Sequence, residues 1–292
     1  MTVSVITCTY NRGHLIGEAI QSVLDQSYQD FEHIIVDESS KDNTEEVVKS
    51  FGDERIKYFK IPNTKGHLSK LINYGINHSM GQYLAIFDSD DVMAKNRLEL
   101  QVKALEQHPQ VGFSFSDVEI FNQQGTIKKS LFNKSGDPFV GNVYDDFINN
   151  KFAICQTTLF LRKECLKISG FVDENLHSGS HNFAVWLSYH HQACIFYEPL
   201  VRVRRHDQNT TQGTTTIRLD EHLFTLNDLF DQQKISKSTY NRMKSHLLYA
   251  RGLRFRHLGK PALARKDLLE SFRSKPTNWK ALARYFQTWV SS

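Results

Sequence analysis

The chain has 292 residues, of which 40% are hydrophobic and 23% charged, a composition typical of a globular protein and not of a long disordered segment. Its net charge of +4 is unevenly distributed, because residues 231–292 carry a charge of +11 and residues 1–230 a charge of −7. No stretch approaches about 18 consecutive apolar residues, which argues against a membrane-spanning helix, and the first apolar run is too short for a secretory signal. The length and the charge contrast predict one large domain followed by a different module.

The first half of the chain alternates strand-like and helix-like patterns. Strand-like runs lie at residues 3–7, 33–37, 56–61 and 83–88. Amphipathic helical stretches lie at residues 14–26, 44–51 and 68–80. This order predicts a parallel sheet with helices on both faces. Such sheets bind ligands beyond the carboxyl ends of their strands, where Asp37 and Asp88 both lie.

The rest of the chain divides into an irregular middle and a helical end. Residues 111–121 alternate like a half-exposed strand, and residues 157–162 and 194–205 are further strand candidates. From about residue 219 only helical periodicity remains, and residues 249–286 resemble one tetratricopeptide-type hairpin that turns at Gly259. The four cysteines include no C-x-x-C pair, so we expect reduced, mostly buried thiols in a cytoplasmic protein.

Three carboxylates follow the strand at 83–88, in the segment FDSDD. Asp90 or Asp91 could cap the next helix, expected from residue 94, but capping does not explain all three, which include Asp88. Oxygen ligands at a strand end can instead bind Mg²⁺ or Mn²⁺, which would neutralise a diphosphate. The pattern therefore favours a metal site and leaves capping as the alternative.

Four segments in order carry a resemblance to glycosyltransferase family 2, the GT-A-fold enzymes that use nucleotide-sugar donors. The family's first two strands, which end in P-T-Y-N-R and V-D-D-G-S, resemble VSVITCTYNR and HIIVDESS. Its D-x-D segment resembles YLAIFDSDD, and its G-F-D-E segment resembles GFVDENL. Its Y-R-x-H-x-x-N-x-S segment resembles VRVRRHDQNTT. The resemblance covers about residues 2–212 and implies a mostly parallel Rossmann-like α/β sheet flanked by helices.

The resemblance implies donor-binding roles for residues of the first half. Four residues are implied to border the nucleotide base and the diphosphate: Thr9, Tyr10, Asn11 and Arg12. Asp37 and Glu38 stand where the family holds uracil and ribose, and a carboxylate can accept from a base N–H and from ribose hydroxyls. Glu38 replaces the usual second Asp, which leaves the preference for uridine open. Asn73 matches a family Asn, and Lys70 is a candidate for positive charge near the diphosphate.

The acidic segment and the end of the catalytic region complete the implied site. Asp88 is expected at the ribose, with Ser89 beside it. The metal ligands implied are Asp90, Asp91 and His206. For His206 the alternative is an exposed loop histidine.

The expected catalytic base is missing. Counting back from Trp186, His181 and Asn182 occupy the places of the Glu and the Asp in the family's G-E-D-x-D-L-W-L segment. A neutral amide has no useful basicity, so Asn182 cannot accept the acceptor's proton. Three explanations stay open: His181 is the base, the enzyme is impaired by a natural or engineered substitution, or the protein binds a nucleotide sugar without transferring it.

The basic residues of the C-terminal end are interspersed with aromatic ones. A solvated basic face over an aromatic core is one interpretation, and attraction to an anionic membrane surface or an acidic or lipid-linked acceptor is the other. Nucleic acid is not expected, since no binding motif accompanies the charge. The oligomeric state is not predicted.

These observations predict a GT-A catalytic domain at residues 1–215, with a nucleotide-binding half at 1–110 and an acceptor-side half at 111–215. A basic helical module at residues 216–292 follows it. The resemblance implies a metal-dependent, inverting glycosyltransferase that moves a sugar from a UDP-sugar to a glycan, lipid-linked or protein acceptor in surface glycan synthesis. The resemblance also implies a cytoplasmic location, at the surface of the inner membrane. A sugar nucleotidyltransferase is disfavoured because TCTYNRGH has a single Gly, and a helical-repeat scaffold because one hairpin cannot account for the first 210 residues.

Overall fold

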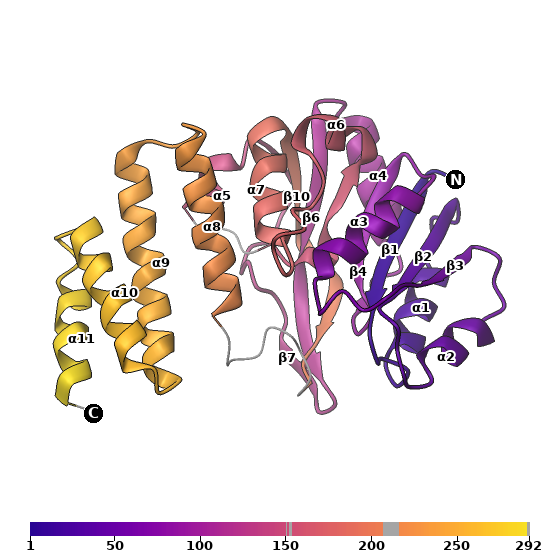
Figure 1. The fold of residues 1–292 in the computed structure, drawn as a ribbon. Helices are drawn as coiled ribbons and strands as arrows, with labels where there is room; N and C mark the ends of the chain where they lie inside the picture. The colour runs from indigo at the N-terminus through magenta and orange to yellow at the C-terminus, as the bar shows by residue number, and fades with distance from the viewer. Residues whose placement is uncertain (150, 152–153, 207–215, 291–292) are drawn as a thin grey trace. The chain divides into compact units, whose positions relative to one another are not determined.

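The structure is a computed structural model that describes residues 1–149, 151, 154–206 and 216–290. The chain divides into two compact units, unit 1 (Met1–His206) and unit 2 (Asp207–Ser292), both drawn in Figure 1. The predicted division between residues 215 and 216 stays a prediction, because residues 207–215 lie outside the described part.

Unit 1 is built on one mixed sheet. Its strands are β1 (Val3–Thr9), β2 (Phe31–Asp37), β3 (Ile56–Lys60), β4 (Tyr83–Asp88), β5 (Val92–Met93), β6 (Val111–Asn122), β7 (Gly125–Lys128), β8 (Phe139–Gly141), β9 (Phe160–Arg162) and β10 (Gln192–Arg204). Its helices are α1 (Ile16–Leu24), α2 (Thr44–Ser50), α3 (Leu68–His78), α4 (Arg97–Gln107), α5 (Tyr144–Ile148), α6 (Leu166–Ser169) and α7 (Ser180–His190), with 3-10 turns η1 (Gln156–Thr158) and η2 (Lys163–Cys165).

The strand order is β3-β2-β1-β4-β9-β6-β10-β5, with β7 beside β6 and β8 beside β10. The four strands from β3 to β4 are parallel, as the alternating pattern predicted. The second half is mixed: β9 runs antiparallel to both β4 and β6, whereas β6 and β10 are parallel. The sheet is therefore a mixed α/β sheet whose first half is parallel, and β1, β2 and β4 end at the same edge.

Burial explains why these segments form strands. β2 is buried at every position, and β1 is buried except at Cys8, as expected for parallel strands with both faces covered. Residues 111–121 form a strand, as predicted, but the expectation that it is half-exposed was wrong, since β6 is buried except at Glu119 and Asn122. The Ser residues that produced the alternation, Ser114 and Ser116, lie in the interior of the sheet.

Unit 2 consists of helices, as the periodicity predicted. They are α8 (Ile217–Asp231), α9 (Lys237–His257), α10 (Pro261–Ser274) and α11 (Trp279–Val290). α9 and α10 form a hairpin that turns at Gly259, whose φ of 66° suits glycine. The two helices approach closely at Gly252, where a Cβ would lie 2.9 Å from Leu268 Cγ. Arg251 joins three helices by pairing with Asp267 and with Asp220 of α8.

Two further expectations concern the chain as a whole. Among the described residues, no helix combines the length and the apolar character needed to cross a bilayer. All four cysteines are free thiols, of which Cys165 and Cys194 are buried.

Candidate functional site

Two loops at the carboxyl ends of β1 and β2 are fastened to each other. The backbone N–H of Asn11 donates to Ser40 Oγ at 2.8 Å, and the backbone N–H of Lys41 donates to Asn11 Oδ1 at 2.8 Å. Asn11 and Ser39 both have positive φ, 51° and 59°, a backbone region that non-glycine residues seldom adopt. Such strain persists where the surrounding contacts impose it, so this junction is held in one shape.

The same junction is crowded at Gly13. Its N–H donates to Asp42 Oδ2 at 3.0 Å, and a Cβ there would lie 2.0 Å from Asn43 Oδ1. The neighbouring Arg12 N–H donates to Thr44 Oγ1 at 3.0 Å. The start of α1 therefore sits directly against the start of α2, which fixes Arg12 at the edge of the sheet.

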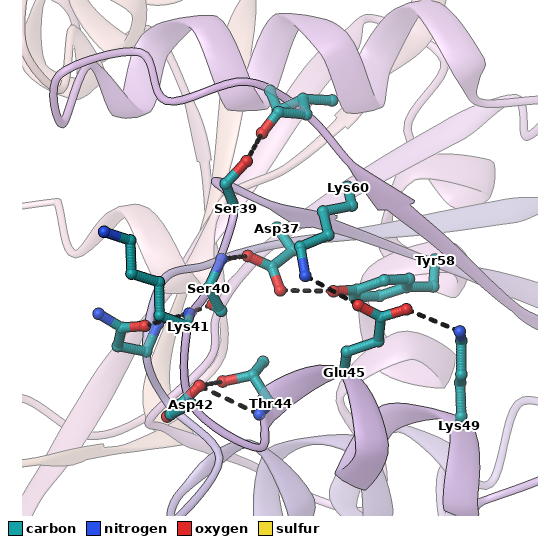
Figure 2. A network of polar contacts seen from close by, with 12 residues as sticks. Asp37, Ser39, Ser40, Lys41, Asp42, Thr44, Glu45, Lys49, Tyr58 and Lys60 are labelled. Carbon is teal, nitrogen blue, oxygen red and sulfur yellow. Dashed lines mark hydrogen bonds and ion pairs between the residues drawn. The ribbon is translucent and has the colours of Figure 1, made fainter.

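Asp37 is fully buried at the end of β2. Its Oδ1 accepts from the N–H of Ser40 at 2.7 Å and its Oδ2 accepts from the hydroxyl of Tyr58 at 2.5 Å, as Figure 2 shows. Burial, together with the contact to Asp37, raises the pKa of Tyr58. Each carboxylate oxygen keeps a second lone pair, so Asp37 can accept from one more donor at each oxygen.

Glu38 uses its extra methylene to reach a third loop. Its Oε1 accepts from the N–H and the hydroxyl of Thr64, both at 2.6 Å, and from the N–H of Gly66 at 3.0 Å. The substitution of Glu for the family's Asp thus has a structural consequence, because this carboxylate orders the segment between β3 and α3.

Thr9 and Tyr10, predicted to border the nucleotide, differ in exposure. Thr9 is 3% exposed and its Oγ1 has no hydrogen-bond partner within the described residues, whereas Tyr10 is 41% exposed. A buried hydroxyl without a partner is costly in a finished protein core. At the carboxyl end of β1, this hydroxyl could donate to a ligand.

The acidic segment after β4 meets two other parts of the chain. Asp90 Oδ2 lies 2.8 Å from His206 Nε2 and 3.9 Å from Arg12 Nε. The structure thus brings together three residues that the resemblance placed at the diphosphate and metal. Asp90 and His206 meet although they are 116 residues apart in the sequence. Ser89 is buried between Asp88 and Asp90.

Arg204 holds this acidic turn in place. Its backbone N–H donates to Asp91 Oδ1 at 3.0 Å, and its Nε donates to the carbonyl of Asp90 at 3.0 Å. Its guanidinium also pairs with Glu18 of α1 and lies 4.5 Å from the centre of the Phe121 ring. The turn is therefore anchored from β10, two residues before His206.

The acidic turn does not cap a helix. α4 begins at Arg97 and its N-cap is Asn96, so the capping alternative for Asp90 and Asp91 is wrong. Burial and the neighbouring Asp90 raise the pKa of Asp88 to about 7, and burial raises the pKa of Asp91 well above its usual range. A bound cation would favour the ionised form of such carboxyl groups, because its charge offsets the cost of burying theirs.

Arg97 is a buried residue that sequence reasoning missed. It is fully buried, donates to Gln101 Oε1 at 2.9 Å and to the carbonyls of Ile86 and Leu159 at 3.3 Å, and leaves Nη1 without a partner within the described residues. Burial lowers its pKa to about 9, against the effect of Asp88 and then Asp91. The available signal was a polar pair, Arg97 and Gln101, four residues apart on the buried face of α4.

The fit of a divalent cation rests on two side chains. In the described ranges, which omit residues 207–215, no three His, Cys, Asp or Glu side chains are arranged as a metal site. Asp90 and His206 nevertheless lie 2.8 Å apart, and a carboxylate is a suitable donor for Mn²⁺ or Mg²⁺. Mg²⁺ and similar ions are commonly held by one or two carboxylates plus substrate phosphates. The residues present therefore fit an ion that a diphosphate completes.

Asn73 has a structural role that accounts for all its polar atoms. Its Nδ2 donates to the carbonyl of Val172 at 2.8 Å and to Glu174 Oε1 at 2.9 Å, and its Oδ1 accepts from the N–H of Val172 at 3.1 Å. It clamps α3 to the GFVDENL segment. Lys70, on the same helix, is exposed, and its placement near a diphosphate stays a prediction.

His181 and Asn182 lie together in the first turn of α7. This helix follows Gly179, whose φ of 65° favours glycine and where a Cβ would lie only 2.5 Å from Val172 Cγ1. Asn182 is 6% exposed and His181 is partly exposed. The GFVDENL segment that Asn73 holds therefore sets where α7 begins, and with it the position of both residues.

Comparisons with known proteins identify the family of this chain. A family model described as "Glycosyl transferase family 2" matches residues 4–167. An uncharacterized glycosyltransferase of Rickettsia bellii is 34% identical over 215 residues, which cover 72% of this chain and 29% of that protein. The E. coli protein named UDP-Glc:alpha-D-GlcNAc-diphosphoundecaprenol beta-1,3-glucosyltransferase WfgD is 34% identical over 127 residues, 44% of this chain and 49% of its own.

One solved structure extends the comparison to the fold. Staphylococcus aureus TarS 1–349 in complex with UDP-GlcNAc superposes with a TM-score of 0.73 at 16% identity, covering 94% of this chain and 81% of that chain. At this identity the likeness concerns the fold, which is of the GT-A type.

Proposed function

Because this chain belongs to glycosyl transferase family 2, we propose that it transfers a sugar from a nucleoside diphosphate donor, a UDP-sugar, to an acceptor hydroxyl. The observation that carries the proposal is the junction of Asp90, His206 and Arg12 at the carboxyl edge of the sheet. The TarS structure, which is in complex with UDP-GlcNAc, supports a uridine donor.

The donor would lie across the ends of β1, β2 and β4. Asp37 would accept from the nucleoside, Thr9 Oγ1, which has no partner within the described residues, would donate to it, and Arg12 would face the diphosphate. Mn²⁺ or Mg²⁺ would be held by Asp90 and His206, with Asp91 beside them. When bound, such an ion neutralises charge on the leaving diphosphate.

The protein's own residues prepare this edge. Arg204 keeps the acidic turn fixed against β10, so that Asp90 and His206 stay within 2.8 Å of each other. A site that is fixed in advance does not lose free energy in rearranging when charge develops. Arg97 places a buried positive charge beneath Asp88 and Asp91, which offsets part of their mutual repulsion.

The acceptor would approach from the α7 side. In a single displacement with inversion, its oxygen forms a bond to the anomeric carbon as the bond to the nucleoside diphosphate breaks, and a base takes the hydroxyl proton. His181 is our candidate for that base, since an imidazole can accept a proton near neutral pH and the Asn182 amide cannot. The name of the WfgD relative includes a diphosphoundecaprenol carrier, which supports a glycan or lipid-linked acceptor in surface glycan synthesis.

A second function is favoured by one observation. With Asn182 at the base position, the chain could bind a nucleotide sugar with impaired or no turnover. The two functions share the donor site and differ only in product formation.

The test separates binding from transfer. Thermal unfolding of the full chain is measured with UDP, GDP and UDP-sugars, with and without Mn²⁺, because a ligand that binds the folded state raises its stability. We expect UDP with Mn²⁺ to raise the melting temperature, and Asp90→Asn to remove the Mn²⁺-dependent part. Glu54→Gln, which changes an exposed carboxylate, is the matched control.

Two outcomes then decide the proposal. A donor that stabilises the chain and yields a glycosylated product supports the transferase, whereas stabilisation without product across a panel of glycan and lipid-linked acceptors supports the binding protein. No stabilisation by any nucleoside diphosphate would refute both.

A further inference from the structure

We propose that helix α11 lies on an anionic phospholipid surface and inserts Trp279, Phe286 and Trp289 into its headgroup region. The proposal concerns unit 2 alone and is independent of the donor site.

α11 has one face against its own unit and another that is apolar and exposed in the part of the chain that the structure describes. Ala281 and Thr288 are buried at 0% and 2% exposure, whereas Trp279, Phe286 and Trp289 are 67%, 60% and 58% exposed. Residues spaced by seven and then three fall on one side of a helix. These three side chains, here called the aromatic stripe, therefore form a continuous exposed row along α11.

The charge around the stripe is strongly positive. Residues 237–292 contain 13 Lys and Arg and only two acidic residues, Asp267 and Glu270. Both acidic side chains are already neutralised, Asp267 by Arg251 at 2.6 Å and Glu270 by Lys244 at 3.1 Å. The net positive charge of these helices therefore favours an anionic partner, such as a membrane surface that carries anionic lipids.

Basic and aromatic groups are also combined locally. Lys280 and Arg284 of α11 are exposed, and the Arg265 guanidinium lies 4.1 Å from the centre of the Trp289 ring. Tryptophan and phenylalanine on one side of a basic helix are typical of helices that lie in the membrane interface. Aromatic rings settle at headgroup depth, where basic groups meet lipid phosphates.

A second copy of the chain is a poorer occupant for two reasons. Two surfaces with this positive surplus would repel each other. The three exposed side chains offer roughly 400 Å² of apolar surface, if about 60% of the area that such side chains can bury is exposed. A stable interface between two copies needs about 800 Å² from each partner, so this surface is too small for one.

The test uses the full chain with vesicles of phosphatidylcholine alone or mixed with phosphatidylglycerol. We expect co-sedimentation with the mixed vesicles only, and its loss at high salt. The triple variant Trp279→Ser, Phe286→Ser and Trp289→Ser should bind at least about tenfold more weakly, which corresponds to the loss of about 1.4 kcal/mol or more. Phe224→Ser, an exposed aromatic of α8, is the matched control and should bind normally.

Fluorescence provides a measurement that does not depend on folding of the triple variant. Trp186→Phe leaves Trp279 and Trp289 as the only tryptophans of the chain. Their emission should shift to shorter wavelength on the mixed vesicles and be quenched by brominated lipid. Unchanged emission, equal binding of the triple variant, or a dimer that the triple variant abolishes would each overturn the proposal.

Discussion

Replacing Asn73 by Ala tests whether this residue serves the donor or the fold. The resemblance placed Asn73 among the donor-binding residues, but the structure shows its amide joined by three hydrogen bonds to Val172 and Glu174. Removal of the amide would leave both backbone groups of Val172 without their partner, and Val172 is 3% exposed. Buried backbone groups without partners carry their full desolvation cost.

The expected magnitude follows from these contacts. Three hydrogen bonds at a net 0.5–1.5 kcal/mol each predict that the free energy of unfolding of unit 1 falls by about 2–4 kcal/mol. Asn73→Asp should be at least as damaging, although it has nearly the same shape. Its second oxygen would face the carbonyl of Val172 and the carboxylate of Glu174, which are both acceptors.

Urea unfolding and UDP titration together distinguish the two roles. Asn77→Ala, an exposed residue of the same type on α3, is the control and should change stability by less than about 0.5 kcal/mol. We expect Asn73→Ala to keep the UDP affinity within about twofold while it loses stability and slows transfer through displacement of α7. Unchanged stability with a UDP affinity about tenfold lower would refute the reasoning and restore Asn73 to the donor site.

Three further predictions concern the site. Asn182→Asp should raise kcat by about 10²-fold or more if the missing base limits transfer. His181→Ala should abolish the wild-type rate if His181 is the base. Steady-state kinetics with a competent donor distinguishes the two explanations. Because the pKa of Asp88 is raised to about 7, Mn²⁺-dependent UDP binding should strengthen as pH rises through about 7, with release of protons. The contribution of protonated Asp88 to stability is complete below its usual pKa of 3.8 and should be lost as pH rises from there to about 7. Calorimetric titrations that do not depend on pH would contradict the binding prediction. Gly13→Ala should lower the melting temperature and weaken UDP binding, because its Cβ would overlap Asn43 and displace the junction of the two loops. Such overpacking costs about 1–3 kcal/mol of folding stability. A variant that melts at the wild-type temperature would show that the junction adjusts to the added methyl group.

The sequence predicted most of the elements because their signals are local. The apolar runs of β1, β2 and β4 and the periodicity of α1, α3 and the C-terminal helices appear within a few residues, and each was located to within a few positions. The acidic turn was also noticeable in the sequence, since capping of the next helix cannot explain all three carboxylates after a buried strand. Family motifs then supplied the candidate roles.

Contacts between distant segments were decided only by the tertiary structure. Nothing local indicates that Arg204 holds the Asp90–Asp91 turn, that Glu38 orders the loop at Thr64, or that Arg97 is fully buried. Each depends on which strands become neighbours.

The insertion of β9 between β4 and β6 shows the reason most clearly. The periodicity of a strand specifies how its side chains alternate, but not whether both faces are covered or which strand pairs with it. β6 looked half-exposed by its own pattern and became interior because it lies between β9 and β10 in the sheet and α4 packs against it. The sequence thus determined the elements and the chemistry at the sheet edge, whereas the strand order decided which of those groups meet, because pairing energy comes from neighbours that the local sequence does not specify.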